Sequence, residues 1–419
     1  MTEVAQPRLT VTGALSKKIT TSEKIVKLTG DFVPVSSKTK NRAPKDDPVY
    51  TAIEKFQQIT DLTNYYDTLT AALVHSNAMT TMNVNGIQMS IAEVLFYKSV
   101  IVPIKGKLLT HLKQHLSYAS GEVERQNILA ENKLKQMLTG SEGADDASIQ
   151  GTKDLFWRTH RYVLVDPLNA KKLVAELEAE LKNAGKPLDL ALANVNAKTR
   201  LSFESRPAPS PYKSLFNDQL SVAAAMSEKK ELSESLPVML QTIKFVSFGL
   251  ENNPYKDEPA LKSPEMFQKF QDGLVRLSAL ASAVIYSNYV TTVQVVNQTI
   301  SVVHAVEMKN GWLSHKRSLL ARLKSEKTRV EAEIKQNNVQ CEQRIQTLLE
   351  KSSSKDNTKL DAEGMSKIEQ MSWDNNRWEL IDPLNVADRI EKLETQITEI
   401  QSTLDTVLSE SNALTMVTV

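Results

Sequence analysis

The sequence predicts a mainly α-helical protein with short β-hairpins (an α+β fold), built from two tandem copies of one helical-hairpin, coiled-coil-like unit. Three observations predict it: a long internal repeat, apolar residues spaced three and four apart over long stretches, and two β-branched segments that each contain a turn. Because the two copies keep their register, we also expect pseudo-twofold symmetry.

The internal repeat is clearest in RYVLVDPLN, which begins at Arg161, and RWELIDPLN, which begins 216 positions later at Arg377. Nearer the N-terminus the offset is 211, as between SNAMTTMNV and SNYVTTVQV. We therefore predict one copy over residues 1–203 and a second over 220–419. Residues 204–219 contain three prolines, which favour an extended, stiffened linker.

The charge of the chain is balanced overall but not along its length. Lys and Arg number 51 against 50 Asp and Glu, so the whole molecule has no strong field toward nucleic acid or an anionic membrane. Residues 1–45 carry nine basic side chains against three acidic ones, which predicts a basic N-terminal arm. A solvated arm is the simpler interpretation, and an arm that contacts nucleic acid or an acidic protein is the alternative.

Each copy is expected to begin with a short amphipathic stretch and a strong helix, followed by a hairpin. Apolar residues from Val49 to Leu73 share one helical face, and those from Phe267 to Leu280 repeat the pattern. Next, Asn85 and Gly86 separate two β-favouring runs and form a possible hairpin turn, because both residues tolerate positive φ. The second copy has Asn297-Gln298 at its expected turn.

A long helix, a loop and a second helix follow in each copy. The long helix of the second copy has apolar residues near a heptad seam from Leu313 to Leu348. The repeated motif after the loop predicts a short strand and then a structural helix start. Its Asp is expected to be the N-cap and its Pro the first helical residue. These residues are Asp166 and Pro167 in the first copy, and Asp382 and Pro383 in the second.

The last helix of the second copy has the most regular apolar pattern in the chain. Its seam, predicted to interact with other helices, consists of Ile390, Leu393, Ile397, Ile400, Leu404 and Val407. In the first copy, Gly185-Lys186-Pro187 should break or kink the equivalent helix.

No residues are predicted to be catalytic, to bind a cofactor or to bind a metal, and we do not expect an enzyme. His111 and His115 have the i,i+4 spacing of a zinc site, but the acidic residue that a zinc peptidase needs between them is missing. Glycine-rich phosphate and dinucleotide motifs are also missing. The single cysteine, Cys341, excludes an intrachain disulfide and lies on an apolar seam.

Neither a classical secretory signal nor a membrane span is expected. The chain does not begin with a basic region, an apolar run and a small-residue cleavage site. The uncharged run Leu277–Val306 contains Ser, Asn, Thr and Gln throughout, which favours buried or paired structure over hydrocarbon.

Three segments carry a resemblance to a known family: SNAMTTMNVNGIQMSIAEVLFYK, LDLALANVNAKTRL and LDTVLSESNALTMV. With their Asn-x-x-Thr, their Asn-Gly turn and their Leu-Asp, each copy resembles the septicolysin-like family of small bacterial and phage proteins. The second copy lacks the turn glycine. The resemblance implies a helical, self-associating protein of bacterial or phage origin.

Taken together, these features favour a non-enzymatic structural or assembly protein. The first expectation is a self-associating subunit of a bacteriophage particle (capsid, decoration or tail-associated), located in the virion or the host cytoplasm and bound to further copies of itself or to other subunits. The alternative is a cytoplasmic binding module whose basic N-terminal arm contacts nucleic acid or an acidic protein. A membrane-active toxin, suggested by the family's name, is the third.

Overall fold

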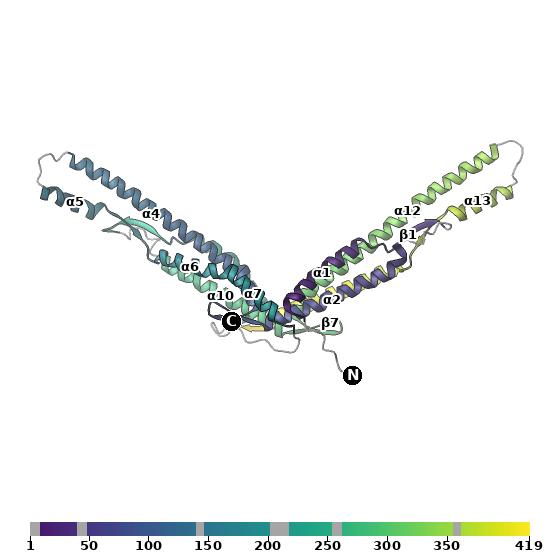
Figure 1. Ribbon diagram of the computed structural model, residues 1–419, viewed down its shortest axis with the longest axis horizontal. Helices are drawn as coiled ribbons and strands as arrows, with labels where there is room; N and C mark the ends of the chain where they lie inside the picture. Colours follow the sequence, from purple (N-terminus) through teal and green to yellow (C-terminus); the bar gives the residue numbers. More distant parts are fainter. Residues whose placement is uncertain (1–8, 40–47, 140–145, 202–217, 254–261, 355–361) are drawn as a thin grey trace. The chain divides into compact units, whose positions relative to one another are not determined.

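Helices dominate the computed structural model, and its strands form short antiparallel pairs (Figure 1). The mainly α prediction is therefore confirmed. The chain folds as two compact units, here called unit 1 (Met1–His75 with Thr292–Glu410) and unit 2 (Ser76–Thr291 with Ser411–Val419). The structure describes residues 9–39, 48–139, 146–201, 218–253, 262–354 and 362–419.

The boundaries of these units differ from those predicted from the repeat. Each unit combines an N-terminal part of one predicted copy with a C-terminal part of the other. The prediction of separate domains at 1–203 and 220–419 is therefore wrong for the folded chain. The physical reason is that a sequence repeat shows which residues resemble one another but not which helices pack together. A helix of one predicted copy can bury its apolar face against helices of either copy, because their apolar patterns are similar. Of the predicted linker, residues 204–217 lie outside the described residues.

Unit 1 is made of two chain segments. The first contains α1 (Val11–Gly30), β1 (Ser36–Thr39), the 3-10 turn η1 (Pro48–Thr51) and α2 (Ala52–Met79). The second contains β7 (Thr292–Val295), β8 (Gln298–Ser301), α11 (Val302–Glu307), the π turn η3 (Met308–Trp312), α12 (Leu313–Ser354), α13 (Ala362–Asn376), β9 (Trp378–Ile381) and α14 (Val386–Leu414).

The main core of unit 1 lies where its two segments meet. Ile25, Phe32 and Ile59 from the first segment pack in one buried cluster with Leu323 and Val386 from the second. Strand β1 pairs antiparallel with β9. The basic N-terminal arm predicted over 1–45 is thus corrected for residues 9–39, because α1 and β1 are folded elements and Ile25 of α1 is buried in this core. Residues 1–8 and 40–45 lie outside the described residues.

Unit 2 contains the remaining elements. They are β2 (Thr81–Val84), β3 (Ile87–Ser90), α3 (Ile91–Phe96), the π turn η2 (Tyr97–Ile101), α4 (Val102–Leu138), α5 (Asp146–His160), β4 (Tyr162–Val165), α6 (Ala170–Ala184), α7 (Lys186–Lys198), β5 (Gln219–Ser221), α8 (Val222–Thr242), β6 (Ser247–Leu250), α10 (Ser263–Val290) and β10 (Met416–Thr418). Figure 1 shows α4 and α5 of this unit forming a long hairpin.

The core of unit 2 joins α4, α8 and α10. Leu240, Phe270 and Leu277 are fully buried there, and β4 pairs antiparallel with β6. The α10 part of the uncharged run is therefore buried structure, as expected. Among the described helices, none has the length and apolar character needed to cross a membrane.

The predicted Asn-Gly hairpin turn is confirmed. Val84 pairs with Ile87, and the two residues between them have positive φ, +52° at Asn85 and +86° at Gly86. In the second hairpin Val295 pairs with Gln298, so the turn residues are Val296-Asn297, one position earlier than predicted. Val296 adopts a φ of +53°, which strains a β-branched residue.

Replacing this strained valine by the residue of the first hairpin should stabilise the protein. We expect Val296→Asn to raise the free energy of unfolding by about 1 kcal/mol, because asparagine enters the left-handed region at lower cost. Urea unfolding followed by circular dichroism measures the change. Asn85→Val is the reciprocal control and should lower the free energy of unfolding by a similar amount. A Val296→Asn variant that is no more stable than the parent chain would show that Val296 is not strained.

The repeated Asp-Pro motif starts its helices later than predicted. Strands β4 and β9 end one residue before the Asp, as expected, but α6 begins only at Ala170 and α14 at Val386. The Asp166 carboxylate accepts a hydrogen bond from the Ala170 backbone N–H at 2.8 Å, and Asp382 accepts one from Val386. Hence neither Asp is the N-cap and neither Pro167 nor Pro383 is helical. The carboxylate reaches the first helical N–H across a turn.

The predicted seam of α14 packs against other helices inside unit 1. Its members are buried or half-buried: Leu393 lies in the main core, beside Ile390, while Ile397, Ile400, Leu404 and Val407 pack in a second cluster. In unit 2 the equivalent stretch is broken at Gly185, between α6 and α7, as the Gly-Lys-Pro sequence predicted.

Candidate functional site: the π turns after the two hairpins

Both units place a π turn directly after a hairpin and a short helix. The turns η2 and η3 lie 211 positions apart, the offset of the repeat. A serine caps the short helix in each unit: Ser90 Oγ accepts the Glu93 backbone N–H at 3.2 Å, and Ser301 Oγ accepts that of His304 at 3.3 Å. Isolated π turns are rare in proteins, and those that occur often lie at functional sites. These two junctions are therefore the candidate functional sites of the described chain.

Each π turn is also held by one ion pair at aligned positions. Lys98 of η2 pairs with Asp189 of α7 in unit 2, and Lys309 of η3 pairs with Asp405 of α14 in unit 1. Both pairs are partly exposed, so each contributes less than about 1 kcal/mol to stability. They join η2 to α7 and η3 to α14, which occupy aligned positions of the two predicted copies.

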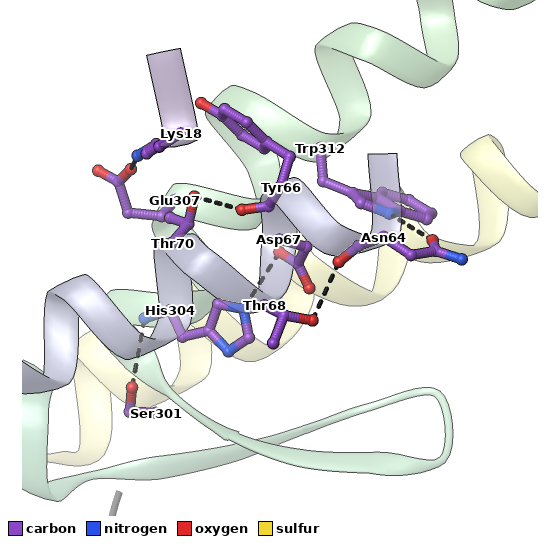
Figure 2. A network of polar contacts seen from close by, with 10 residues as sticks. All are labelled: Lys18, Asn64, Tyr66, Asp67, Thr68, Thr70, Ser301, His304, Glu307 and Trp312. Atoms are coloured by element: carbon purple, nitrogen blue, oxygen red, sulfur yellow. Dashed lines mark hydrogen bonds and ion pairs between the residues drawn. The ribbon is translucent and has the colours of Figure 1, made fainter. Parts of the chain in front are cut away.

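A polar network surrounds η3 in unit 1 (Figure 2). His304 Nε2 of α11 lies 3.1 Å from Asp67 Oδ1 of α2. Trp312 Nε1 donates to Asn64 Oδ1 at 3.4 Å. Figure 2 also shows Lys18 of α1 beside Glu307, with a distance of 3.5 Å between Nζ and Oε2. The network joins the first segment of unit 1 to the second, and His304 and Asp67 form its most shielded pair, with side-chain exposures of 14% and 21%.

The ring of Tyr66 closes the junction in unit 1. A Cβ atom at Gly311 would lie 2.8 Å from Tyr66 Cε1, so the π turn and the ring need a glycine between them. The other side of the ring meets His315 edge-on, with centroids 4.9 Å apart, and His315 Nε2 lies 3.4 Å from Ser22 Oγ. This tight packing makes the junction suited to holding helices together.

Three partly buried histidines predict an acid-sensitive fold. Burial lowers the pKa of His75 and His315 in unit 1 from 6.5, and burial together with His111 and Lys244 lowers the pKa of His115 in unit 2. Their folded-state pKa values lie below the unfolded value, so the unfolded chain takes up protons first as pH falls. Stability should thus decrease as pH drops below 6.5 toward the folded pKa values.

Urea unfolding between about pH 7 and pH 5 tests this expectation. The double variant His115→Gln/His315→Gln should show a smaller loss of stability across the same range than the parent chain. An unchanged pH dependence in the double variant would assign the effect to other groups.

Unit 2 has a cleft beside its π turn. The cleft has a volume of about 560 Å³ and is lined by the β2–β3 hairpin, η2, α4, α6 and α10. On its wall, Tyr97 Oη donates to Glu180 Oε1 at 2.8 Å, and Lys105 Nζ pairs with the same carboxylate oxygen. Ile101 and Val275 line the cleft at the positions that align with Trp312 and Asn64 of unit 1.

The structure separates the predicted site residues by role. Asn85 of the hairpin turn lines the cleft and donates to Tyr97 Oη at 3.4 Å. Asp166 and Asp382 accept hydrogen bonds from the first helical N–H groups of α6 and α14, and the α14 seam is core. His115 packs against Phe245 and accepts its backbone N–H at 3.4 Å. In the described part of the chain, no group of three or more His, Cys, Asp or Glu side chains could hold a metal.

Sequence reasoning missed the residues of the cleft wall. Tyr97 and Lys105 lie more than seventy positions before Glu180 in the chain, so no local motif joins them. A signal was nevertheless available in the repeat, because a tryptophan in one copy aligns with an isoleucine in the other. A smaller side chain at an aligned apolar position indicates a space in one copy that the larger side chain fills in the other.

No protein-family model, curated protein or solved structure matches this chain. The resemblance to the septicolysin-like family accordingly stays a prediction from the short motifs that carry it.

Proposed function

We propose that this protein is a non-enzymatic assembly protein, a self-associating subunit of a larger particle such as a bacteriophage particle. A tandem duplication with pseudo-twofold symmetry is part of the proposal, because such a chain would present two similar surfaces to its neighbours.

The observation that carries the proposal is a set of exposed apolar residues, the hairpin apolar set, on the α4–α5 hairpin of unit 2 and the α12–α13 hairpin of unit 1. The set consists of three aligned pairs with nearly equal exposed fractions: Ile128 (51%) and Val339 (47%), Met137 (53%) and Leu348 (55%), Leu155 (65%) and Met371 (66%).

Single exposed apolar residues are normal on protein surfaces and need no explanation. Tyr118 and Leu129 of α4 are such residues. Both are exposed, but they align with the polar residues Arg329 and Gln340 of α12, so their apolar character is not kept. The hairpin apolar set differs, since side-chain identity changes within each pair while apolar character and exposure stay the same. A contact surface used twice would keep those two properties, which supports association through the hairpins.

Light scattering of the full chain over a range of concentrations tests the proposal. We expect a mass above that of one chain, and a shift toward the single-chain mass in the double variant Leu155→Gln/Met371→Gln. Leu129→Gln is the matched control, because it removes an exposed leucine and introduces the residue of the aligned position.

Two results would contradict the proposal. One is a single-chain mass at every concentration. The other is an equal loss of association in Leu129→Gln, which would make exposed apolar area in general, rather than the hairpin apolar set, responsible for association.

A further inference from the structure

We propose that the cleft of unit 2 binds a small amphiphilic cation, meaning an apolar body that carries one amine or guanidinium group. This site goes beyond the assembly function and does not depend on it, because the cleft lies within unit 2 and uses none of the hairpin apolar set.

The size and lining of the cleft suit the apolar body. About 560 Å³ lies within the range of roughly 300 to 1,000 Å³ that small-molecule sites occupy. Its floor contains Met89, Leu108 and Phe267, which belong to the buried core of unit 2, together with the partly buried Leu177. An apolar ligand entering the cleft would cover these side chains and release the water in contact with them.

The charges of the cleft favour a cation over an anion. Among the described residues, Lys105 is the only basic one in the lining, and its ammonium is already paired with Glu180, which also accepts from Tyr97. Two further carboxylates line the cleft, Glu176 on α6 and Asp272 on α10. With Lys105 and Glu180 neutralising each other, Glu176 and Asp272 leave the lining with a net negative charge.

Neither of these two carboxylates is strongly neutralised by its neighbours. Glu176 lies 3.8 Å from Lys172 one turn earlier on the exposed side of α6, a distance typical of a weak surface pair. Asp272 accepts a hydrogen bond at 2.8 Å from Gln268, which carries no charge. A ligand cation at the rim would therefore gain electrostatic attraction from both helices.

Unit 1 shows that the fold itself does not require this arrangement. At the aligned positions Trp312 replaces Ile101, Lys392 replaces Glu176, and Gln396 replaces Glu180. Trp312 is buried there, with Lys316 Nζ 5.1 Å from the centre of its ring. The space beside Ile101 and the two α6 carboxylates are thus specific to unit 2, whereas Asp272 has a counterpart in Asp61 of unit 1.

Isothermal titration calorimetry of the full chain with n-decylammonium and with decanoate tests the proposal, because the two probes share an alkyl chain and differ in charge. We expect decylammonium to bind at least about tenfold more tightly. The double variant Glu176→Gln/Asp272→Asn should reduce that preference to about twofold. Glu178→Gln is the matched control, since its carboxylate lies on the same helix, pairs with Lys113 and does not line the cleft.

Ile101→Trp should close the cleft with the residue of unit 1 and abolish decylammonium binding. Circular dichroism checks that this variant folds; if it does not, the exposed-charge variants decide the question alone. The proposal is overturned if decylammonium does not bind, if decanoate binds equally well, or if the double carboxylate variant keeps the full preference.

Discussion

Cutting the chain in the joint between residues 203 and 220 is expected to give two fragments that fold only when they are mixed. Unit 1 needs α1 and α2 from the first fragment and α12 and α14 from the second. Unit 2 needs α4 and α6 from the first and α8 and α10 from the second. Neither fragment alone contains a complete core.

The buried residues indicate how large this effect should be. Ile25, Phe32 and Ile59 are fully buried in unit 1, and a fragment ending at residue 203 would lose the helices that cover them. Each such side chain contributes roughly 1.5 to 3 kcal/mol through burial. Because a domain is stabilised by only about 5 to 15 kcal/mol in total, exposing a few of them is enough to prevent folding.

The two fragments can be expressed separately and studied alone and together. We expect weak helical signal without a cooperative unfolding transition for each fragment alone, and a 1:1 complex with the helicity of the whole chain after mixing. Circular dichroism and light scattering give these quantities. A fragment 1–203 that is monomeric and unfolds cooperatively would contradict the finding that each unit is built from segments of both fragments.

Trp312→Ala should be among the most destabilising single substitutions in unit 1, lowering the free energy of unfolding by about 3 to 5 kcal/mol. The indole is buried in the second core cluster of the unit, and its N–H donates to Asn64. Its removal would leave a cavity and would take away the ring beside the buried ammonium of Lys316, whose pKa burial already lowers. Each of these adds to the cost of the variant.

Urea unfolding measures the loss, with Tyr118→Ala as the exposed aromatic control. Tyr118 is exposed on α4, so its replacement should change stability by no more than about 0.5 kcal/mol. A Trp312→Ala variant as stable as this control would show that the indole is not a core residue.

The elements of this fold were predictable because their signals are local. Apolar spacing located the long helices, the Asn85-Gly86 pair located a hairpin, and Gly185 located the break between α6 and α7. Local signals were weaker at helix starts. The Asp-Pro motif predicts an N-cap at the Asp, whereas Asn169 and Asn385 take positive φ and delay each helix by a turn.

The partners of these elements were decided only by the tertiary structure. Sequence alone determined which faces of the chain must be buried, since apolar periodicity reports the cost of leaving a face in water. It did not determine which half of the chain supplies the covering face, because the two halves have similar apolar patterns. The same limit applies to the cleft, where Tyr97, Lys105 and Glu180 meet only because α4 packs on α6. It also applies to the α14 seam, because a regular apolar pattern fits an internal core as well as a contact with another molecule.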